Sequence, residues 1–176
     1  MRASLLVSSF GCWLVAALLA STASAAEMQL KTVDLTGDYE DSGSVVSATS
    51  DEMAQEPFLS ALVRLEFDSK LAAIYHDQTA RIRIKHVPGS LEIQIIDRDG
   101  EVSWRGQWGE RTGYVQRGSS VVLRFRRESP ANEEVLFTFD PVASRQLLQV
   151  TVQRIETTIL GPMVRQKGEY LFPRMP

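Results

Sequence analysis

Few residues in this sequence have the types and spacing that metal binding or acid–base catalysis requires. His76 and His86 are its 2 histidines, and Asp77 directly follows the first of them. The segment between the two histidines is much longer than the short spacers that bring a pair of imidazoles to one metal ion. We therefore expect ordinary surface or rim histidines, with no metal and no cofactor.

One acidic segment, Asp97–Glu101, partly resembles the start of a calcium-binding loop. Such a loop needs a longer run of oxygen ligands ending in a glutamate, whereas Val102 and Trp104 already alternate as in a strand. The Asp99-Gly100 pair is typical of a hairpin turn. The sequence also contains no nucleophile elbow, zinc-protease motif or phosphate loop, and we expect a protein without enzymatic activity.

A second group of candidate residues is aromatic and could bind an apolar ligand. It comprises Trp104, Trp108, Phe125, Phe137 and Phe139. Even spacing on a strand places Trp104 with Trp108, and Phe137 with Phe139, on a single face. In a small barrel, inward side chains either fill the interior or line one ligand cavity, and the sequence leaves both alternatives open.

A third group is basic and could bind a partner. Arg81, Arg83 and Lys85 share one face of a predicted strand, and Arg124 and Arg126 share a face of another. Such a face is either a solvated surface that discourages aggregation or a patch for an acidic partner. The formal net charge of the whole chain is −3, which argues against a nucleic-acid partner.

The strands that must position these groups are predicted from the alternation of apolar and polar residues. β-Branched and aromatic residues recur at every second position through most of the chain beyond Ala80. The predicted strands are Arg81–Lys85, Leu91–Ile95, Val102–Trp108, Val121–Arg126, Val135–Phe139, Leu148–Gln153 and a short final strand, Glu169–Phe172.

Short turns separate these strands. We expect turns at Val87–Ser90, Asp97–Gly100, Gln116–Ser119 and Ser129–Asn132, and we expect Gly161-Pro162 to interrupt the last long apolar run. Connections of this length favour antiparallel pairing, because parallel strands need long crossovers.

The N-terminal part of the domain is less regular. Thr36–Glu40 is predicted to be a first strand, and Ser42–Ser50 a loop or a ragged strand. Pro57 can open a helical turn, so we predict a short helix over Glu56–Leu62 that closes one end of the β structure. Alternation over Val63–Phe67 suggests a further strand.

The resulting eight or nine antiparallel strands, as an approximate count, fit an up-and-down barrel or, alternatively, a β-sandwich. Gly37-Asp38-Tyr39 resembles the Gly-x-Trp start of lipocalin barrels, with Tyr39 at the place of the tryptophan. The chain is similar in topology to small exported bacterial proteins with lipocalin-like barrels. The resemblance implies a single barrel domain over residues 26–176, with a closing helix and a ligand site in its interior.

Residues 1–25 have the pattern of a cleavable signal peptide. Met1-Arg2 supplies a positive start, Leu5–Ala20 is free of charge, and Ala23-Ser24-Ala25 fits a cleavage site. The apolar run is shorter than a bilayer-spanning helix, which needs about 20 residues. We therefore expect a periplasmic or secreted protein that begins at Ala26, with no stable membrane span after cleavage.

Cleavage would also remove Cys12, the only cysteine. The residues before Cys12 include a glycine but lack the leucine of a lipoprotein box, so we expect cleavage rather than lipidation. The mature chain would then have no disulfide and no thiolate, and its core alone would stabilise the fold.

Two hypotheses of function follow from these residues. The first is a periplasmic binding protein that carries an apolar or amphipathic small molecule inside a barrel. The alternative is a protein-interaction module, an accessory or inhibitor of an envelope complex, that acts through its outer basic face.

Overall fold

The computed structural model describes residues 34–55, 57–67, 79–126, 133–142 and 146–176, all within one compact unit, Lys31–Pro176. Three predictions lie outside the described residues: the signal peptide at 1–25, His76 with Asp77, and the turn Ser129–Asn132. In chain order the elements are β1 Gly37–Tyr39, β2 Ser44–Ala48, α1 Leu59–Phe67, β3 Thr79–Val87, β4 Ser90–Asp97, β5 Val102–Gly109, η2 Glu110–Thr112, β6 Tyr114–Arg117, β7 Ser120–Arg126, β8 Glu133–Val142, β9 Leu147–Thr158 and β10 Gly161–Pro173.

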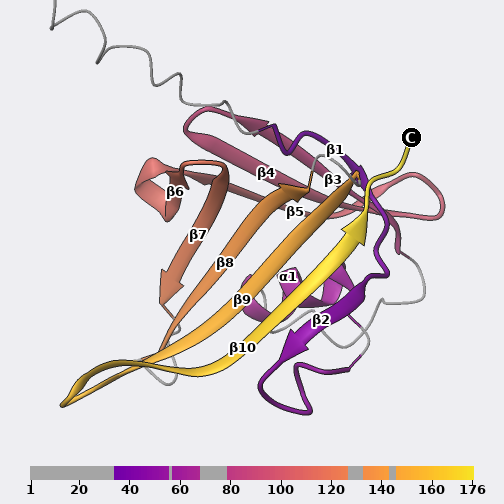
Figure 1. The fold of residues 1–176 in the computed structure, drawn as a ribbon. Helices are drawn as coiled ribbons and strands as arrows, with labels where there is room; N and C mark the ends of the chain where they lie inside the picture. The colour runs from indigo at the N-terminus through magenta and orange to yellow at the C-terminus, as the bar shows by residue number, and fades with distance from the viewer. Residues whose placement is uncertain (1–33, 56, 68–78, 127–132, 143–145) are drawn as a thin grey trace, which may run out of the picture. The chain divides into compact units, whose positions relative to one another are not determined.

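The strands form two antiparallel sheets, which confirms the predicted all-β class (Figure 1). One sheet has the order β1-β3-β4-β5 and the other has the order β2-β10-β9-β8-β7-β6. Among the described residues no strand pairing joins β5 to β6, so the ladder does not close into a ring there.

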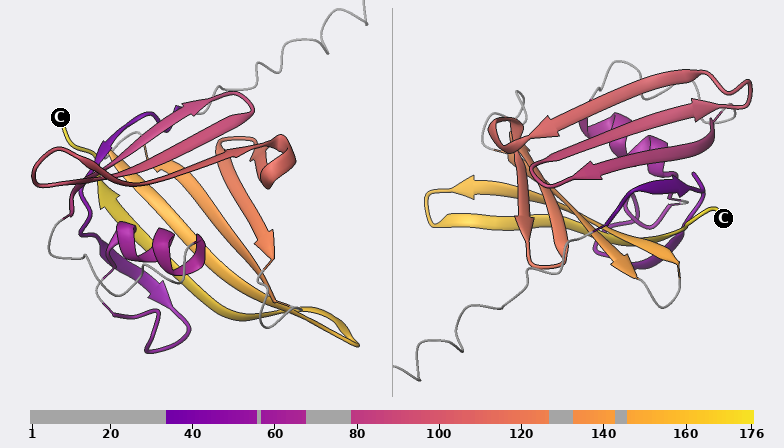
Figure 2. Two further views of the ribbon diagram at one scale, coloured as in Figure 1. Left: turned by 180° about the vertical axis from the view of Figure 1, so that it is seen from behind. Right: turned by 90° about the horizontal axis from the view of Figure 1, so that it is seen from above.

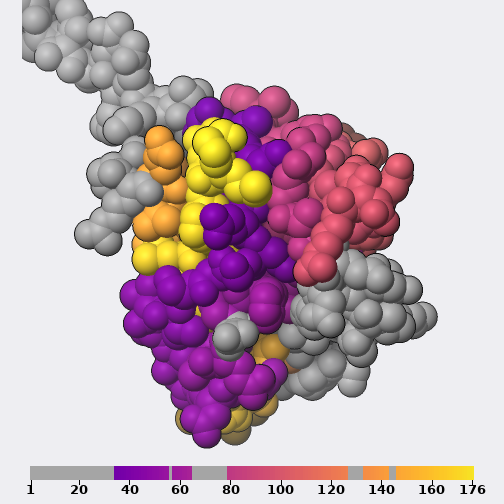
Figure 3. Space-filling model, turned by 90° about the vertical axis from the view of Figure 1, so that its right-hand side faces the viewer, coloured from indigo at the N-terminus to yellow at the C-terminus, as the bar shows by residue number. Residues whose placement is uncertain are grey.

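A short segment near each end of the domain ties the two sheets together. Tyr39 of β1 forms an isolated bridge with Arg174, just beyond β10, while β1 also pairs with β3. The Glu40 amide donates to the Pro173 carbonyl at 2.9 Å, and the Met175 amide donates to the Asp38 carbonyl at 2.8 Å. In Figure 3 the yellow C-terminal residues accordingly lie against the indigo N-terminal segment.

The predicted turns within the described residues are confirmed. Gly89 and Gly118 adopt φ of +84° and +60° in the β3–β4 and β6–β7 turns, a region that glycine tolerates and side chains with a Cβ disfavour. In the β4–β5 turn the Asp97 carboxylate accepts a hydrogen bond from the Glu101 amide at 2.9 Å. Asp97, the first carboxylate of the segment that partly resembles a calcium-binding loop, therefore stabilises a hairpin turn.

The prediction of a strand over Val63–Phe67 is wrong, because these residues belong to α1. The predicted helix also begins too early, since α1 starts at Leu59. The Asp41 side chain accepts hydrogen bonds from the Ser60 amide at 2.7 Å and the Ser60 hydroxyl at 2.8 Å, which fixes the start of the helix. Leu59 and Val63, one helical turn apart, are both 0% exposed, so the same apolar residues fit a helix better than a strand.

The end of the chain forms a longer hairpin than the sequence predicted. The turn lies at Ile159-Leu160, and β10 then extends from Gly161 to Pro173, with a shift of register against β9 between Val164 and Gln166, so the short final strand was underestimated. Pro162 is accommodated opposite Thr157. The described parts of the neighbouring strands pair with the hairpin as far as Glu156 on β9 and Gly168 on β10, and the ribbon of the hairpin extends past these points (Figures 1 and 2).

Both sheets bury one face in a common core, to which α1 also contributes. The alternation on β3, β4, β8 and β9 places every second side chain in this core. The largest fully buried side chains are Tyr39, Tyr170, Phe137, Phe139, Phe172, Leu35, Leu59, Ile82, Ile84, Leu91, Ile93 and Ile95.

Candidate functional site

The predicted aromatic residues lie on strands that face the core between the sheets. Phe137 and Phe139 are both 0% exposed, and their ring centroids lie 6.1 Å apart. Phe125 extends this row, with its ring centroid 6.3 Å from that of Phe137, and it is only partly buried. The structure thus brings these three side chains together within the core cluster.

Trp104 and Trp108 lie on the same face of β5, as their spacing predicted. Their ring centroids are 6.2 Å apart, and Gly106 lies between them. A Cβ atom at position 106 would overlap both indole rings, so glycine is what allows them to approach. Trp108 is 9% exposed, whereas Trp104 is partly buried against the edge of the core.

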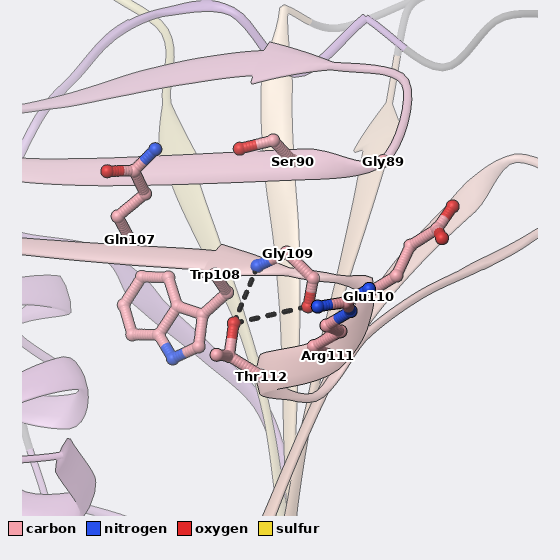
Figure 4. A pocket seen from close by; sticks show the side chains of 8 residues that line it. All are labelled: Gly89, Ser90, Gln107, Trp108, Gly109, Glu110, Arg111 and Thr112. Carbon is pink, nitrogen blue, oxygen red and sulfur yellow. Dashed lines mark hydrogen bonds between the residues drawn. The ribbon is translucent and has the colours of Figure 1, made fainter.

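A solvent-open pocket of about 470 Å³ lies at the corner where β5 passes into η2 (Figure 4). The Thr112 hydroxyl shapes this corner, because it accepts from the Gly109 amide at 2.7 Å and donates to the Gly109 carbonyl at 3.2 Å. The pocket is lined by Gly89, Ser90, Gln107, Trp108, Gly109, Glu110, Arg111 and Thr112. Of these, only Trp108 was among the candidate site residues from the sequence; Gly89 and Ser90 lie in the predicted turn Val87–Ser90, and Glu110, Arg111 and Thr112 form η2, for which the sequence offered no motif.

The first basic group lies on the outer face of the four-stranded sheet and is joined there by Arg105. Asp38 accepts two hydrogen bonds from Arg83, at 2.8 and 3.0 Å, and lies 3.2 Å from the Arg81 guanidinium. Glu92 lies 3.6 Å from both Lys85 and Arg105. The hydrogen bonds from Arg83 hold the pKa of Asp38 below its ordinary value.

The second basic group lies on the other sheet, so the two groups do not form one stripe. Arg124 of β7 makes a bidentate ion pair with Glu134 of β8. In the register of the two strands, Glu134 lies opposite Arg126. Hydrogen bonding to Arg124 lowers the pKa of Glu134. Because the carboxylate partners come from other strands, the alternation within one strand could not reveal them.

His86 links the two sheets rather than lying free on the surface. It is 8% exposed, and its Nε2 lies 2.9 Å from the Tyr114 hydroxyl on β6. The Thr36 hydroxyl donates to the His86 carbonyl and accepts from the His86 amide, both at 3.1 Å. The side chain therefore connects β3 of one sheet to β6 of the other.

The residues that the structure describes contain no group of three or more side chains placed to hold a metal ion. Among these residues no helix is long and apolar enough to cross a bilayer.

The most exposed apolar residues lie at the projecting end of the β9–β10 hairpin. Ile159 is fully exposed and Leu160 is 95% exposed, while Met163 and Val164 are 43% and 50% exposed. The Thr158 hydroxyl fixes the turn, since it donates to the Gly161 carbonyl at 2.8 Å and accepts from the Leu160 amide at 3.2 Å. We name residues 157–164 the apolar tip.

Sequence reasoning missed the apolar tip because the run before Gly161-Pro162 looked like a buried strand. The available signal was an isoleucine and a leucine immediately before a Gly-Pro pair, a place where turn residues are usually polar or glycine.

Comparisons with protein-family models, curated proteins and solved structures found no match to this chain.

Proposed function

We propose that this protein is an exported, non-enzymatic interaction module of the cell envelope, and that it acts through its outer surface. The observation that carries the proposal is the contrast between a core filled by aromatic side chains and a hairpin end that holds two large apolar side chains in solvent. Soluble proteins usually bury such residues or use them in an interface. The signal-peptide pattern of residues 1–25 supports export.

The architecture that we propose is a lipocalin-like barrel whose ring is interrupted between β5 and β6. The position of β1 supports this description, because it pairs with β3 and is bridged to the end of β10. β3 to β5 and β6 to β10 follow one another in chain order, as in an up-and-down barrel, whereas β2 pairs with β10.

The filled core favours an interaction module over a carrier of apolar molecules. Phe137 and Phe139 are 0% exposed, and Tyr39 and Tyr170 are 2% and 1% exposed, so these inward side chains fill the interior rather than line an open cavity. An apolar ligand would be left with Trp104 and Phe125, the two partly buried aromatic residues of the predicted set.

The basic face offers weaker support for an acidic partner. The Arg105 and Lys85 side chains are 58% and 55% exposed, whereas Glu92 beneath them is 20% exposed. The two cationic groups are therefore more exposed than the carboxylate that they share. Exposed cations can guide an acidic surface toward this sheet without providing much affinity.

Isolation of the tagged protein from its own envelope under non-denaturing conditions tests this function. We expect the tagged protein to elute in a complex with one defined protein, and we expect the two purified proteins to form the same complex when mixed. Native mass spectrometry should show no small molecule bound to the tagged protein. A monomer that carries a stoichiometric apolar molecule would overturn the proposal and favour the carrier.

A further inference from the structure

The apolar tip has the properties of an interaction hot spot. Resting on the function proposed above, we propose that Ile159 and Leu160 insert together into an uncharged apolar pocket on the partner protein. Two adjacent, fully exposed aliphatic side chains at a hairpin turn are unusual, and the tip is where they project farthest from the neighbouring strands.

Side-chain hydrogen bonds stabilise the turn of the tip. The two hydrogen bonds of the Thr158 hydroxyl close the loop. Gly161, directly after the loop, adopts a positive φ of +114°. Ile159 and Leu160 occupy the two central positions of the turn, and neither has a positive φ, so the turn itself does not require asparagine, aspartate or glycine there. A stabilised turn also lowers the entropy lost on binding.

The charges around the tip indicate an uncharged pocket. Residues 157–164 carry no ionisable side chain. The first charged residues on the two strands, Glu156 and Arg165, form an ion pair with each other at the base of the tip. Neither an acidic nor a basic pocket would find an opposite charge among the residues that enter it.

The size of the tip argues against a lipid bilayer as the partner. Ile159 and Leu160 together bring about eight side-chain carbons, while even a myristoyl chain of about fourteen carbons gives only marginal binding, on the order of 10⁴ M⁻¹. Peripheral membrane segments add free lysine, arginine and tryptophan, whereas the cations nearest the tip, Arg165 and Lys167, are each paired with a glutamate. A protein pocket adds shape complementarity around the same two side chains.

Strand addition to the edge of β10 is also disfavoured. Pro162 lies on this projecting segment and lacks the amide that an added strand would need. Arg165, with a 54% exposed side chain, places a charge on the same segment. Insertion of the turn itself is the mode of recognition that remains.

The test uses the full mature chain and the purified partner from the native complex. The double variant I159S/L160S should bind more weakly, with a dissociation constant at least about 30-fold higher than that of the parent chain. The control V46S/V87S changes two half-exposed valines on other strands, 53% and 60% exposed, and should bind like the parent chain. The variant T158V keeps both apolar side chains but removes the turn bonds, and it should weaken binding by a smaller factor.

A photo-crosslinking residue at position 160 should form an adduct within an apolar pocket of that partner, whereas one at position 87 should not. Wild-type affinity in I159S/L160S would overturn the inference while the interaction function stands. Flotation of the parent chain, but not the double variant, with vesicles of phosphatidylethanolamine and phosphatidylglycerol would overturn it in favour of a membrane. Failure of the parent chain to rebuild any complex would instead defeat the proposed function itself.

Discussion

The two ends of the β9–β10 hairpin carry similar residue types in opposite surroundings. At one end Leu148, Val150 and Phe172 are 0% exposed, because neighbouring strands and the other sheet cover them. At the other end Ile159 and Leu160 stand in solvent beyond the described ends of β8 and β2. One pair of strands thus supplies both core and surface. The comparison teaches that an apolar pattern predicts a strand, while only the neighbours decide whether its side chains are buried.

The largest effect is expected from a cavity in the core. Phe137 is fully buried between two other phenylalanines, so F137A should lower the free energy of unfolding by about 3–5 kcal/mol, measured by urea denaturation. A loss below about 1 kcal/mol would mean that the core is loosely packed, and the contrast between the two ends of the hairpin would lose its basis.

A smaller loss is expected from overpacking between the tryptophans. In G106A the new methyl group meets both indole rings, so we expect a loss of about 1–3 kcal/mol and a change in tryptophan fluorescence. G109A is the matched control, because its Cβ would lie 3.7 Å from the Gly89 carbonyl oxygen, an ordinary contact. Equal stability of the two variants would contradict the close packing of Trp104 and Trp108.

The ion pairs of the outer face should matter less and should depend on pH. The folded-state pKa of Asp38 is depressed, so its ion pair stabilises the protein above the unfolded-state pKa, near the ordinary value of 3.8. This contribution is lost as the pH falls through the lower folded-state pKa. At neutral pH we expect D38N to destabilise the protein by up to about 1 kcal/mol, with less effect in high salt.

Unfolding curves of the parent chain and D38N across acidic pH measure this difference. The two curves should converge as the pH falls below the folded-state pKa of Asp38. A difference that grows on acidification would show that the sign is wrong.

The smallest effect on stability is expected at the apolar tip. Because Ile159 and Leu160 are almost wholly exposed, I159S/L160S should change the free energy of unfolding by no more than about 0.5 kcal/mol. Thermal and urea unfolding of the double variant provide the measurement. A loss above about 1 kcal/mol would indicate that the tip packs against the chain itself.

Much of the fold follows from local pattern. The alternation of Arg81–Lys85 and Leu91–Ile95, and the turns at Val87–Ser90 and Asp97–Gly100, correctly predict β3, β4 and the first hairpins. Over Val63–Phe67 the same apolar residues also fit a helix, and the residue that bonds the start of this helix, Asp41, is distant in sequence. Pairings between distant segments, such as Tyr39 with Arg174, have no local signal.

The candidate sites were harder to predict because they depend on which strands become neighbours. The face of Arg81, Arg83 and Lys85 was identified correctly, but Arg105 joins it only through the pairing of β4 with β5. The apolar tip depends on the unequal lengths of neighbouring strands, which alternation within a single strand does not encode.

The central claim is that binding resides in the exposed end of the hairpin and not in the aromatic core. Its most direct test is the dissociation constant of the rebuilt complex for the parent chain, I159S/L160S and F125L, which alters the partly buried rim of the core. We predict that the tip variant loses affinity at unchanged stability and that F125L binds normally. Normal binding by the tip variant, with lost binding by F125L, would contradict the account.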